Sequence, residues 1–279
     1  MSFTLPASAG FALRAAATFA SGFPGTRTSN DDPEAVSFAW PLDGDWRSAS
    51  VVLHQQGNDI RGEIDGPHTP EIEALVRRDV ERILCLDVDA SQFSAVGRHD
   101  PIVGELQKRF AGLRPVLFYT PYEAAAWSII GQRIQMTQAA TIKQRLADEY
   151  GERGAFPPPA RLSELASPQR GLTAKKVEQL RQLGAAAITG VLDRDRLLEQ
   201  RYDDAEKQLR ELPGIGPFSA ELILIRGMGA PDALPRHENR LHVATRTAYG
   251  LPSNADIDVI ADRWRPYRSW VALLLRAAA

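Results

Sequence analysis

Apolar and polar residues alternate in the first third of the chain, and this alternation predicts β-structure. One alternating run covers residues 36–40, and two more, 50–55 and 60–64, flank a Gly-Asn dipeptide. A period of two places apolar side chains on one face of a strand, and a Gly-Asn turn joins antiparallel strands. The period becomes helical over residues 70–84. We therefore predict a small antiparallel sheet backed by helices.

From residue 115 onward, the apolar positions follow a helical period and no strand pattern appears. The clearest helix opens at Pro121, with Thr120 as its N-cap and Glu123 at its third position. Its apolar stripe is formed by Tyr122, Ala125, Ala126, Ile129 and Ile130. We predict an α+β fold, with a sheet-and-helix N-terminal domain at residues 1–88 and an all-helical domain at residues 89–279.

The most informative stretch of the helical half is a turn between two helical segments. Its sequence is Leu212-Pro213-Gly214-Ile215-Gly216. The apolar faces of the two helices comprise Ala205, Leu209 and Leu212 before the turn, and Phe218, Leu222 and Ile225 after it. Asp203 or Asp204 is the expected N-cap of the first helix, and Pro213 marks its end. Because Gly214 and Gly216 have no Cβ, the N–H groups that open the second helix can bind a nucleic-acid phosphate.

The composition fits a globular protein and excludes several kinds of site. The chain has 279 residues, of which 44% are hydrophobic and 24% charged, enough for a large core. The lone Cys85 excludes an internal disulfide, a cysteine-based zinc site and a four-cysteine iron–sulfur cluster, and we expect it to pack in the core. The net charge of −2 argues mildly against DNA binding, although backbone N–H groups bind phosphate without side-chain charge. No apolar run approaches a membrane span and no signal peptide is recognisable, so we expect a cytoplasmic protein.

Four segments of the helical half carry motifs in a fixed order. They are Ile-Ile-Gly-Gln-Arg-Ile-Gln at 129–135, Gly-Leu-Thr-Ala-Lys-Lys-Val-Glu-Gln-Leu at 171–180, the hairpin at 204–227, and Ala-Asp-Arg-Trp-Arg-Pro-Tyr-Arg-Ser-Trp at 261–270. Together they resemble the helix-hairpin-helix DNA glycosylases, and most closely the bacterial 3-methyladenine DNA glycosylase II branch. The resemblance implies an all-α helix-hairpin-helix glycosylase core behind the N-terminal sheet, and double-stranded DNA with damaged bases as the partner.

The resemblance assigns DNA contacts to two turns. In the family, the residues after a Gly-Gln pair enter the duplex where the extruded base has left a gap. Gln132 and Arg133 occupy those places here, and Arg133 is the candidate wedge, because a guanidinium stacks on bases and bonds to their edges. The alternative for Arg133 is a surface arginine at a helix end. Gly214, Ile215 and Gly216 would bind the phosphate. No motif requires a cofactor, but the family implies a monovalent cation on the backbone carbonyls of Arg210, Leu212 and Ile215.

The catalytic position implied by the resemblance carries a glutamate. The segment Pro-Asp-Ala-Leu-Pro-Arg-His-Glu at 231–238 aligns with one in which the family has a catalytic aspartate, and Glu238 takes its place. A carboxylate there stabilises positive charge on the sugar and helps to position water. The extra methylene moves it by roughly an ångström, so either the pocket is retuned or the site is silent. His237 either assists or perturbs Glu238 or is a solvent-facing cap residue, and Asp232 is an alternative acid or caps a turn.

Three further positions belong to the base pocket of the family. Phe218 stands where bifunctional members carry a Schiff-base lysine, so the resemblance implies hydrolysis without a lyase step. An aromatic ring there attracts a methylated, positively charged purine through its π-face, whereas the alternative role for Phe218 is core packing. Leu222 and Arg276 take two more pocket positions that are often aromatic, and Arg276 would repel a cationic base.

Three functions are consistent with these residues. Our main prediction is a monomeric, monofunctional DNA N-glycosylase of base excision repair, which flips out and hydrolyses alkylated bases of the 3-methyladenine type. The second is a catalytically weak or silent protein that binds damaged DNA. The third is a helix-hairpin-helix scaffold for protein partners.

Overall fold

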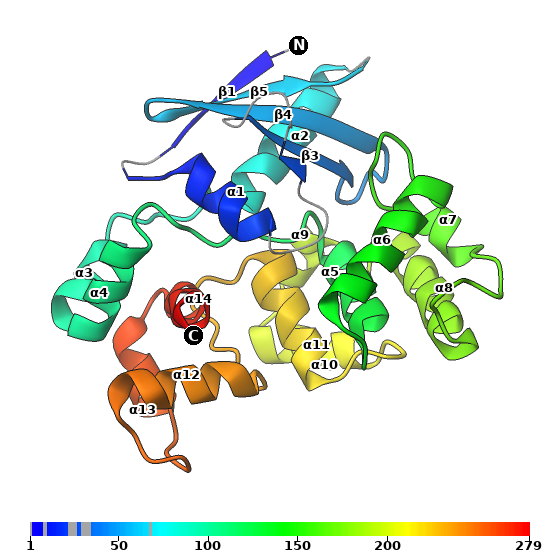
Figure 1. Cartoon of the computed structure of the whole chain (residues 1–279). Helices are drawn as coiled ribbons and strands as arrows, with labels where there is room; N and C mark the ends of the chain where they lie inside the picture. The colour runs from blue at the N-terminus through cyan, green and yellow to red at the C-terminus, as the bar shows by residue number, and fades with distance from the viewer. Residues whose placement is uncertain (1, 8–9, 22–26, 29–34, 67–68) are drawn as a thin grey trace.

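The computed structural model describes residues 2–7, 10–21, 27–28, 35–66 and 69–279. A five-stranded antiparallel sheet with the order β1-β5-β4-β3-β2 lies at the N-terminal end of this chain (Figure 1). The strands are β1 (Ser2–Pro6), β2 (Arg27–Thr28), β3 (Ala35–Pro41), β4 (Ser48–Gln56) and β5 (Asp59–Ile64). The three strands predicted from the alternation, β3 to β5, are confirmed. β1 and β2 were not predicted, because five and two residues are too few to display a period.

Two helices accompany the sheet. α1 (Leu13–Ser21) was not predicted, whereas α2 (Pro70–Ile83) begins at the expected residue. The Thr69 hydroxyl accepts a hydrogen bond from the Ile72 amide at 3.4 Å and so caps α2. The buried faces of α1, α2 and the sheet share one hydrophobic cluster. The expected sheet backed by helices is therefore confirmed.

Helices make up the regular structure of residues 69–279. Besides α2 they are α3 (Phe93–His99), α4 (Pro101–Arg109), α5 (Pro121–Gly131), α6 (Met136–Tyr150), α7 (Pro159–Ser163), α8 (Ala174–Ile188), α9 (Arg194–Leu198), α10 (Tyr202–Arg210), α11 (Pro217–Leu222), the π-helix η1 (Ile223–Met228), α12 (Asn239–Tyr249), α13 (Asp258–Ala261), the 3-10 helix η2 (Asp262–Trp264) and α14 (Arg268–Ala278). The predicted α+β class is confirmed. None of these helices is long and apolar enough to cross a membrane.

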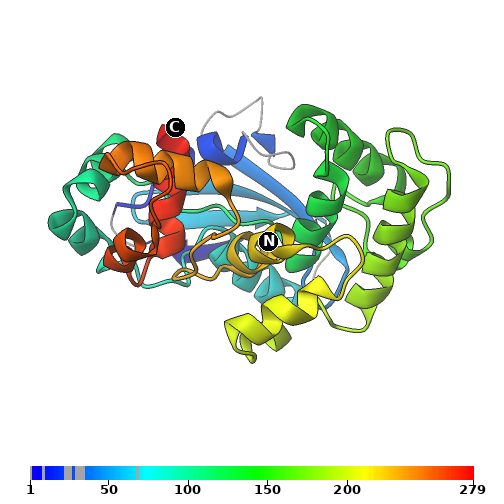
Figure 2. The same cartoon turned by 90° about the horizontal axis from the view of Figure 1, so that it is seen from below.

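The helices pack around two hydrophobic clusters. One surrounds α5 and includes residues of α6, α8, α10 and α11, and the other surrounds α14 and includes residues of α3, α4, α12 and α13. Figures 1 and 2 show the two groups on opposite sides of the helical half. Cys85 is buried in the α14 cluster, which confirms its expected packing role, and Trp264, Tyr267 and Trp270 are buried in the same cluster. The predicted domain at 89–279 thus contains two cores, and its boundary at residue 88 stays a prediction.

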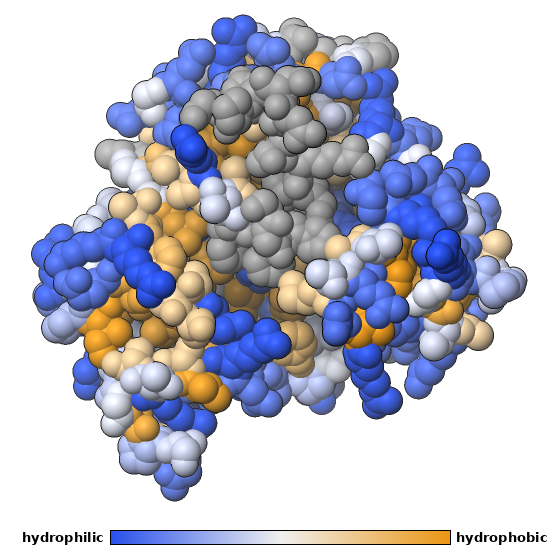
Figure 3. Space-filling view, in the orientation of Figure 1, coloured by the Kyte–Doolittle hydropathy of each residue, from blue (hydrophilic) through white to orange (hydrophobic). Residues whose placement is uncertain are grey.

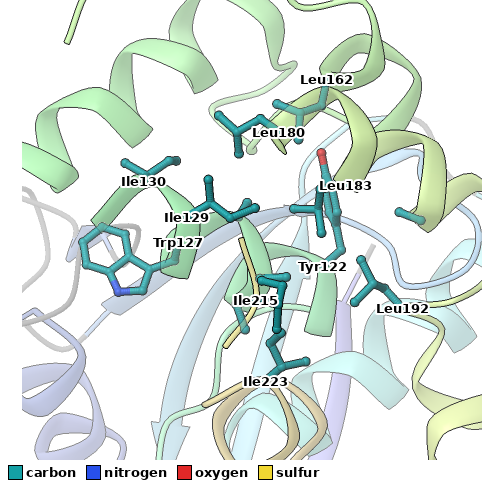
Figure 4. Close-up of a cluster of buried hydrophobic side chains, with 14 of the residues drawn as sticks. Tyr122, Trp127, Ile129, Ile130, Leu162, Leu180, Leu183, Leu192, Ile215 and Ile223 are labelled. Carbon is teal, nitrogen blue, oxygen red and sulfur yellow. The ribbon is translucent and has the colours of Figure 1, made fainter. Parts of the chain in front are cut away.

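Helix α5 is the centre of the first cluster. Every residue from Pro121 to Ile130 is buried, and the apolar side chains of α5 meet those of α8 and η1 (Figure 4). Thr120 caps the helix as predicted, since its hydroxyl accepts a hydrogen bond from the Glu123 amide at 3.0 Å. The expectation of a single buried stripe was wrong. Glu123 faces the interior because it forms a 2.8 Å ion pair with the buried Lys143 of α6.

One arginine connects helix α2, which packs on the sheet, to two segments of the α5 cluster. Arg82, at the end of α2, is buried and donates hydrogen bonds to the carbonyl oxygens of Phe118 at 3.0 Å, of Gly227 at 2.8 Å and of Tyr119. A guanidinium presents several donors in a fixed plane, so it can hold three carbonyls at once. These bonds fix the end of η1 and the entry to α5 relative to the sheet.

A buried carboxyl beside this junction makes stability depend on pH. Burial raises the pKa of Asp43 to about 7, and its Oδ1 lacks a hydrogen-bond partner among the described residues. The folded state therefore holds a proton that the unfolded state releases near pH 4, so this stabilisation is complete below pH 4 and is lost as the pH rises through 7. We expect Asp43→Asn to match the wild type near pH 4 and to exceed its unfolding free energy by a few kcal/mol at pH 8, at about 1.4 kcal/mol per pKa unit.

Urea denaturation between pH 4.5 and 8 measures this difference. The matched control is Asp45→Asn, because hydrogen bonding to the exposed Arg47 lowers the pKa of Asp45. That substitution should cost less than about 1 kcal/mol, and only above pH 4. Equal stability of Asp43→Asn and the wild type at pH 8 would show that folding does not raise the pKa of Asp43.

Candidate nucleic-acid interface and active site

The glycine-containing turn lies between α10 and α11, as the sequence predicts. Gly214 has φ +91°, a conformation that favours glycine, and a Cβ there would lie 2.8 Å from the Gln179 side chain. Gly216 has φ −96° and is the N-cap of α11, and a Cβ there would meet nothing within 4 Å. Gly214 is therefore required by the turn itself, whereas Gly216 leaves open space in front of the helix.

Backbone donors are free at this end of α11. The Ile215 amide closes the turn by donating to the Leu212 carbonyl at 3.0 Å. The amides of Gly216, Phe218 and Ser219 donate to no acceptor in the part of the chain that the structure describes. α10 begins after Arg201, so Asp203 and Asp204 lie in its first turn, and the prediction that one of them is the N-cap was wrong. Unpaired amides at a helix N-terminus are donors for an anion.

The turn between α5 and α6 is fastened to this hairpin. The Gln132 side chain donates to the Gly214 carbonyl at 2.7 Å. Lys176 of α8 donates to the carbonyls of Ile130 at 2.7 Å and of Gln132 at 2.8 Å, and burial lowers its pKa. Arg133 follows in the left-handed region at φ +57° and its side chain is exposed. The two candidate DNA-contacting turns therefore form one unit, from which Arg133 projects.

The second hairpin helix departs from the predicted pattern. α11 has six residues and continues as the π-helix η1, so the residues at Phe218, Leu222 and Ile225 do not share one buried face. Ile225 is buried and Leu222 is partly buried, but Phe218 is 49% exposed. Core packing is thus excluded for Phe218, whose ring is accessible to a ligand. A π-helical turn shifts the register of a helix and is frequent at functional sites.

A buried carboxylate of α11 holds the loop that leads to Glu238. Glu221 accepts hydrogen bonds from the backbone amides of Arg236 at 3.0 Å and of His237 at 2.8 Å. The His237 Nδ1 atom also lies 2.9 Å from Glu221 Oε1. The His237 ring therefore contacts Glu221, and its expected assistance to Glu238 stays a prediction without a direct contact. Glu221 was not among the residues selected from the sequence, because nothing local marks a polar residue in a helix as the anchor of a loop fifteen residues away.

The start of α14 holds the same loop from the other side. Asp232 accepts from Arg265 Nη1 at 2.6 Å and from Arg268 Nε at 3.0 Å. The Ser269 amide and hydroxyl donate to the Pro231 carbonyl at 3.0 and 2.8 Å. Asp232 thus serves two ion pairs, which argues against it as the alternative acid. The motif at 261–270 fixes this loop as well as the beginning of the last helix.

Glu238 lies at the N-cap of α12, and its carboxylate meets Arg276 of α14. Glu238 Oε1 accepts a hydrogen bond from Arg276 Nε at 2.6 Å. The side chains are 29% and 27% exposed, so the pair is accessible and not buried. The sequence placed both residues in one site, and the structure brings them into contact. A carboxylate at a helix N-terminus also benefits from the macrodipole.

Open space adjoins this pair. Apolar surface gathers over the α14 group of helices in the space-filling view (Figure 3). A groove of about 910 Å³ runs between α12 and the end of α14, and Val243, Leu275 and Arg276 are among the residues that line it. Arg276 therefore contacts Glu238 and also borders open space.

The implied cation site rests on the hairpin carbonyls. A monovalent cation would be held by the backbone oxygens of Arg210, Leu212 and Ile215. The Leu212 oxygen already accepts the Ile215 amide, but a carbonyl has a second lone pair for a metal ion. The oxygen donor set suits a hard cation, and the site stays a prediction. Among the described residues, no cluster of three His, Cys, Asp or Glu side chains suits a metal.

Comparison with curated proteins identifies relatives. No family model matches the chain. A DNA-3-methyladenine glycosylase of Bacillus subtilis is 26% identical over 204 residues, which are 68% of this chain and 67% of that protein. DNA-3-methyladenine glycosylase 2 of Escherichia coli is 31% identical over 182 residues, or 61% of this chain and 62% of that protein. The match to a mycobacterial protein described as a probable bifunctional transcriptional activator/DNA repair enzyme covers 68% of this chain and only 40% of that protein, at 31% identity.

Solved structures share the fold over nearly the whole chain. The 3-methyladenine DNA glycosylase from Archaeoglobus fulgidus superimposes with a TM-score of 0.78 at 20% identity, covering 98% of this chain and 97% of that one. The Clostridium acetobutylicum 8-oxoguanine glycosylase/lyase gives 0.72 at 15% identity, with 99% and 95% covered. These structures show that the chain has the fold of the helix-hairpin-helix DNA glycosylases, and the curated relatives show that its sequence is similar to bacterial DNA-3-methyladenine glycosylases.

Proposed function

We propose that the protein is a monofunctional DNA N-glycosylase that removes alkylated bases of the 3-methyladenine type. The observation that carries the proposal is the accessible carboxylate of Glu238, held at the N-terminus of α12 by a loop that α11 and α14 fix from two sides. Relatives named DNA-3-methyladenine glycosylase support the activity. Several solved neighbours are complexes with DNA, which supports DNA as the partner. The cytoplasm and a monomeric state stay predictions from the sequence.

Each part of the proposed site has a distinct task. The free amides before α11 bind a backbone phosphate, and the exposed Arg133 fills the space that the extruded nucleotide leaves in the duplex. The exposed ring of Phe218 stacks on the base. Glu238 stabilises the positive charge that develops on the sugar as the glycosidic bond breaks, and orients the water that attacks C1′. With phenylalanine at position 218, no amine is available there for a Schiff base, so the reaction ends at hydrolysis.

A second candidate function rests on the same carboxylate. Arg276 bonds to Glu238 at 2.6 Å and neutralises its charge in the unliganded protein. If that pair persists with a nucleotide bound, the carboxylate stabilises the sugar cation less, and the protein recognises damage without excising the base. The two functions share the DNA-contacting turns and differ in the chemical step alone.

A single-turnover experiment separates these two functions. In single-turnover assays on a duplex that contains 3-methyladenine or 7-methylguanine, we expect Glu238→Gln to release the base at least about a hundredfold more slowly than the wild type, because an acid–base group contributes 10²–10⁴-fold. Glu63→Gln, a change at a carboxylate 56% exposed on β5 in the sheet, is the matched control and should retain the wild-type rate. Tight binding without release by the wild type would favour the silent binder.

A further prediction concerns DNA binding by the hairpin. Gly216→Asp places a carboxylate in the open space in front of the free amides, and should weaken duplex binding by tenfold or more in a titration at low salt. Because Gly216 has φ −96° and no neighbour within 4 Å of a Cβ, Gly216→Ala should unfold at the wild-type temperature. Gly214→Ala should lose about 1–3 kcal/mol of stability, since it forces a side chain into the left-handed region against Gln179.

Gly57→Asp serves as the control for added charge. Gly57 lies in the β4–β5 turn, also with nothing within 4 Å of a Cβ, and aspartate tolerates its φ of +62°. If Gly216→Asp and Gly57→Asp bind duplex DNA equally well, the hairpin does not contact DNA, and the scaffold function is favoured.

A further inference from the structure

Arg276 offers hydrogen-bond donors beside the proposed catalytic carboxylate. Its Nε is engaged by Glu238 at 2.6 Å, whereas Nη1 and Nη2 bond to no acceptor among the residues that the structure describes. These nitrogens carry four N–H groups in a fixed plane. We propose that Arg276 donates a hydrogen bond to the departing base and thereby accelerates the release of neutral damaged bases more than the release of cationic ones. The proposal rests on the proposed glycosylase function and names the substrate class of that site.

The positions of the reacting atoms indicate that the Arg276 guanidinium lies close to an acceptor atom of the base. A carboxylate that stabilises the sugar cation must lie against C1′, and Arg276 is in hydrogen-bond contact with that carboxylate. The acceptor atoms N3 of a purine and O2 of a pyrimidine are two bonds from the glycosidic nitrogen, which is itself attached to C1′. An N–H group that borders the carboxylate is therefore close to these acceptors. The groove of about 910 Å³ beside Arg276 leaves room for the guanidinium to turn toward a base.

The charge of the base decides whether such a donor helps. When the C1′–N bond of a neutral base breaks, the electron pair stays on the base, which becomes an anion. Water adds its oxygen to C1′, one proton of that water is lost to the Glu238 carboxylate or to solvent, and the base takes up a proton from solvent. A guanidinium stabilises the developing anion, and this stabilisation is absent from the ground state, so it accelerates the chemical step.

A cationic base does not become an anion when it leaves, so it does not require a guanidinium to stabilise it. 3-Methyladenine and 7-methylguanine carry a positive charge while attached to the sugar and leave as neutral molecules. A guanidinium repels the bound cation, so it weakens binding and contributes little to bond breakage. The three pocket positions also disfavour a cationic base. Leu222 is aliphatic, and of Phe218, Leu222 and Arg276 only Phe218 offers a π-face to a cation.

The experiment compares neutral and cationic bases in single-turnover assays on matched duplexes. Hypoxanthine and 1,N6-ethenoadenine are the neutral probes, and 7-methylguanine is the cationic probe. For Arg276→Gln we expect the maximal rate on both neutral bases to fall by tenfold or more, and the rate on 7-methylguanine by less than threefold. The enzyme concentration that gives half the maximal rate on 7-methylguanine should decrease. Arg276→Lys, which keeps the charge, should restore part of the rate on the neutral bases.

The control is Arg61→Gln, an arginine 47% exposed on β5 in the sheet, which should change no rate. If Arg276→Gln slows all three bases by the same factor, Arg276 acts through the position of Glu238 alone and the selection is refuted. If the wild type releases none of the bases, the proposed glycosylase function fails, and the role of Arg276 fails with it. Thermal unfolding of Arg276→Gln, expected within a few degrees of the wild type, excludes misfolding as the cause of a slower rate.

Discussion

The arrangement of the site depends on a buried carboxylate that receives the backbone of a loop. Glu221 is 6% exposed and accepts hydrogen bonds from the backbone amides of Arg236 and His237, immediately before Glu238, and the His237 ring lies 2.9 Å from its carboxylate. A buried carboxylate is costly unless its oxygens are bonded, so the loop and the carboxylate each require the other. Hydrogen bonds to a charged acceptor contribute about 1.5–3 kcal/mol each, more than enough to fix one turn of chain. The position of Glu238 is therefore set by the hairpin helix itself.

The same loop spans two hydrophobic cores. Glu221 lies on α11, whose apolar residues pack in the α5 cluster, whereas Arg268 and Ser269, which hold Asp232 and Pro231, lie at the start of α14, whose apolar residues form the other cluster. Because this loop is held by both cores, the Glu238 carboxylate cannot move with one core independently of the other. The sheet is joined to this assembly through Arg82, which bonds to the end of η1. The two candidate DNA-contacting turns on one core and Glu238 at the border of the other are thereby kept in a constant relation, which the proposed catalysis on an extruded nucleotide requires.

Local signals in the sequence predicted much of this structure, but they could not predict contacts between residues far apart in the chain. The alternation predicted β3 to β5, the helical period predicted the start of α2, Thr120 predicted the start of α5, and the glycines predicted the hairpin. The π-helix, the exposure of Phe218 and the ion pair of Glu123 with Lys143 follow from tertiary packing, which a helical period does not contain. Motif resemblance placed Glu238 and Arg276 in one site, but their direct bond, across 38 residues, required the structure.

The geometry of the N-cap gives a physical reason why glutamate and arginine occur together here. An aspartate at an N-cap folds back and accepts the amides of the first helical turn, which both satisfies those amides and restrains the carboxylate. Glu238 occupies the N-cap of α12 without any such bond, because its longer side chain carries the carboxylate past those amides. A carboxylate released from its own helix needs another restraint, and Arg276 provides one at 2.6 Å from the facing helix. Glu238 is thus restrained by a charged partner where an aspartate would be restrained by backbone amides, and in the proposed complex that partner brings a positive charge close to the base.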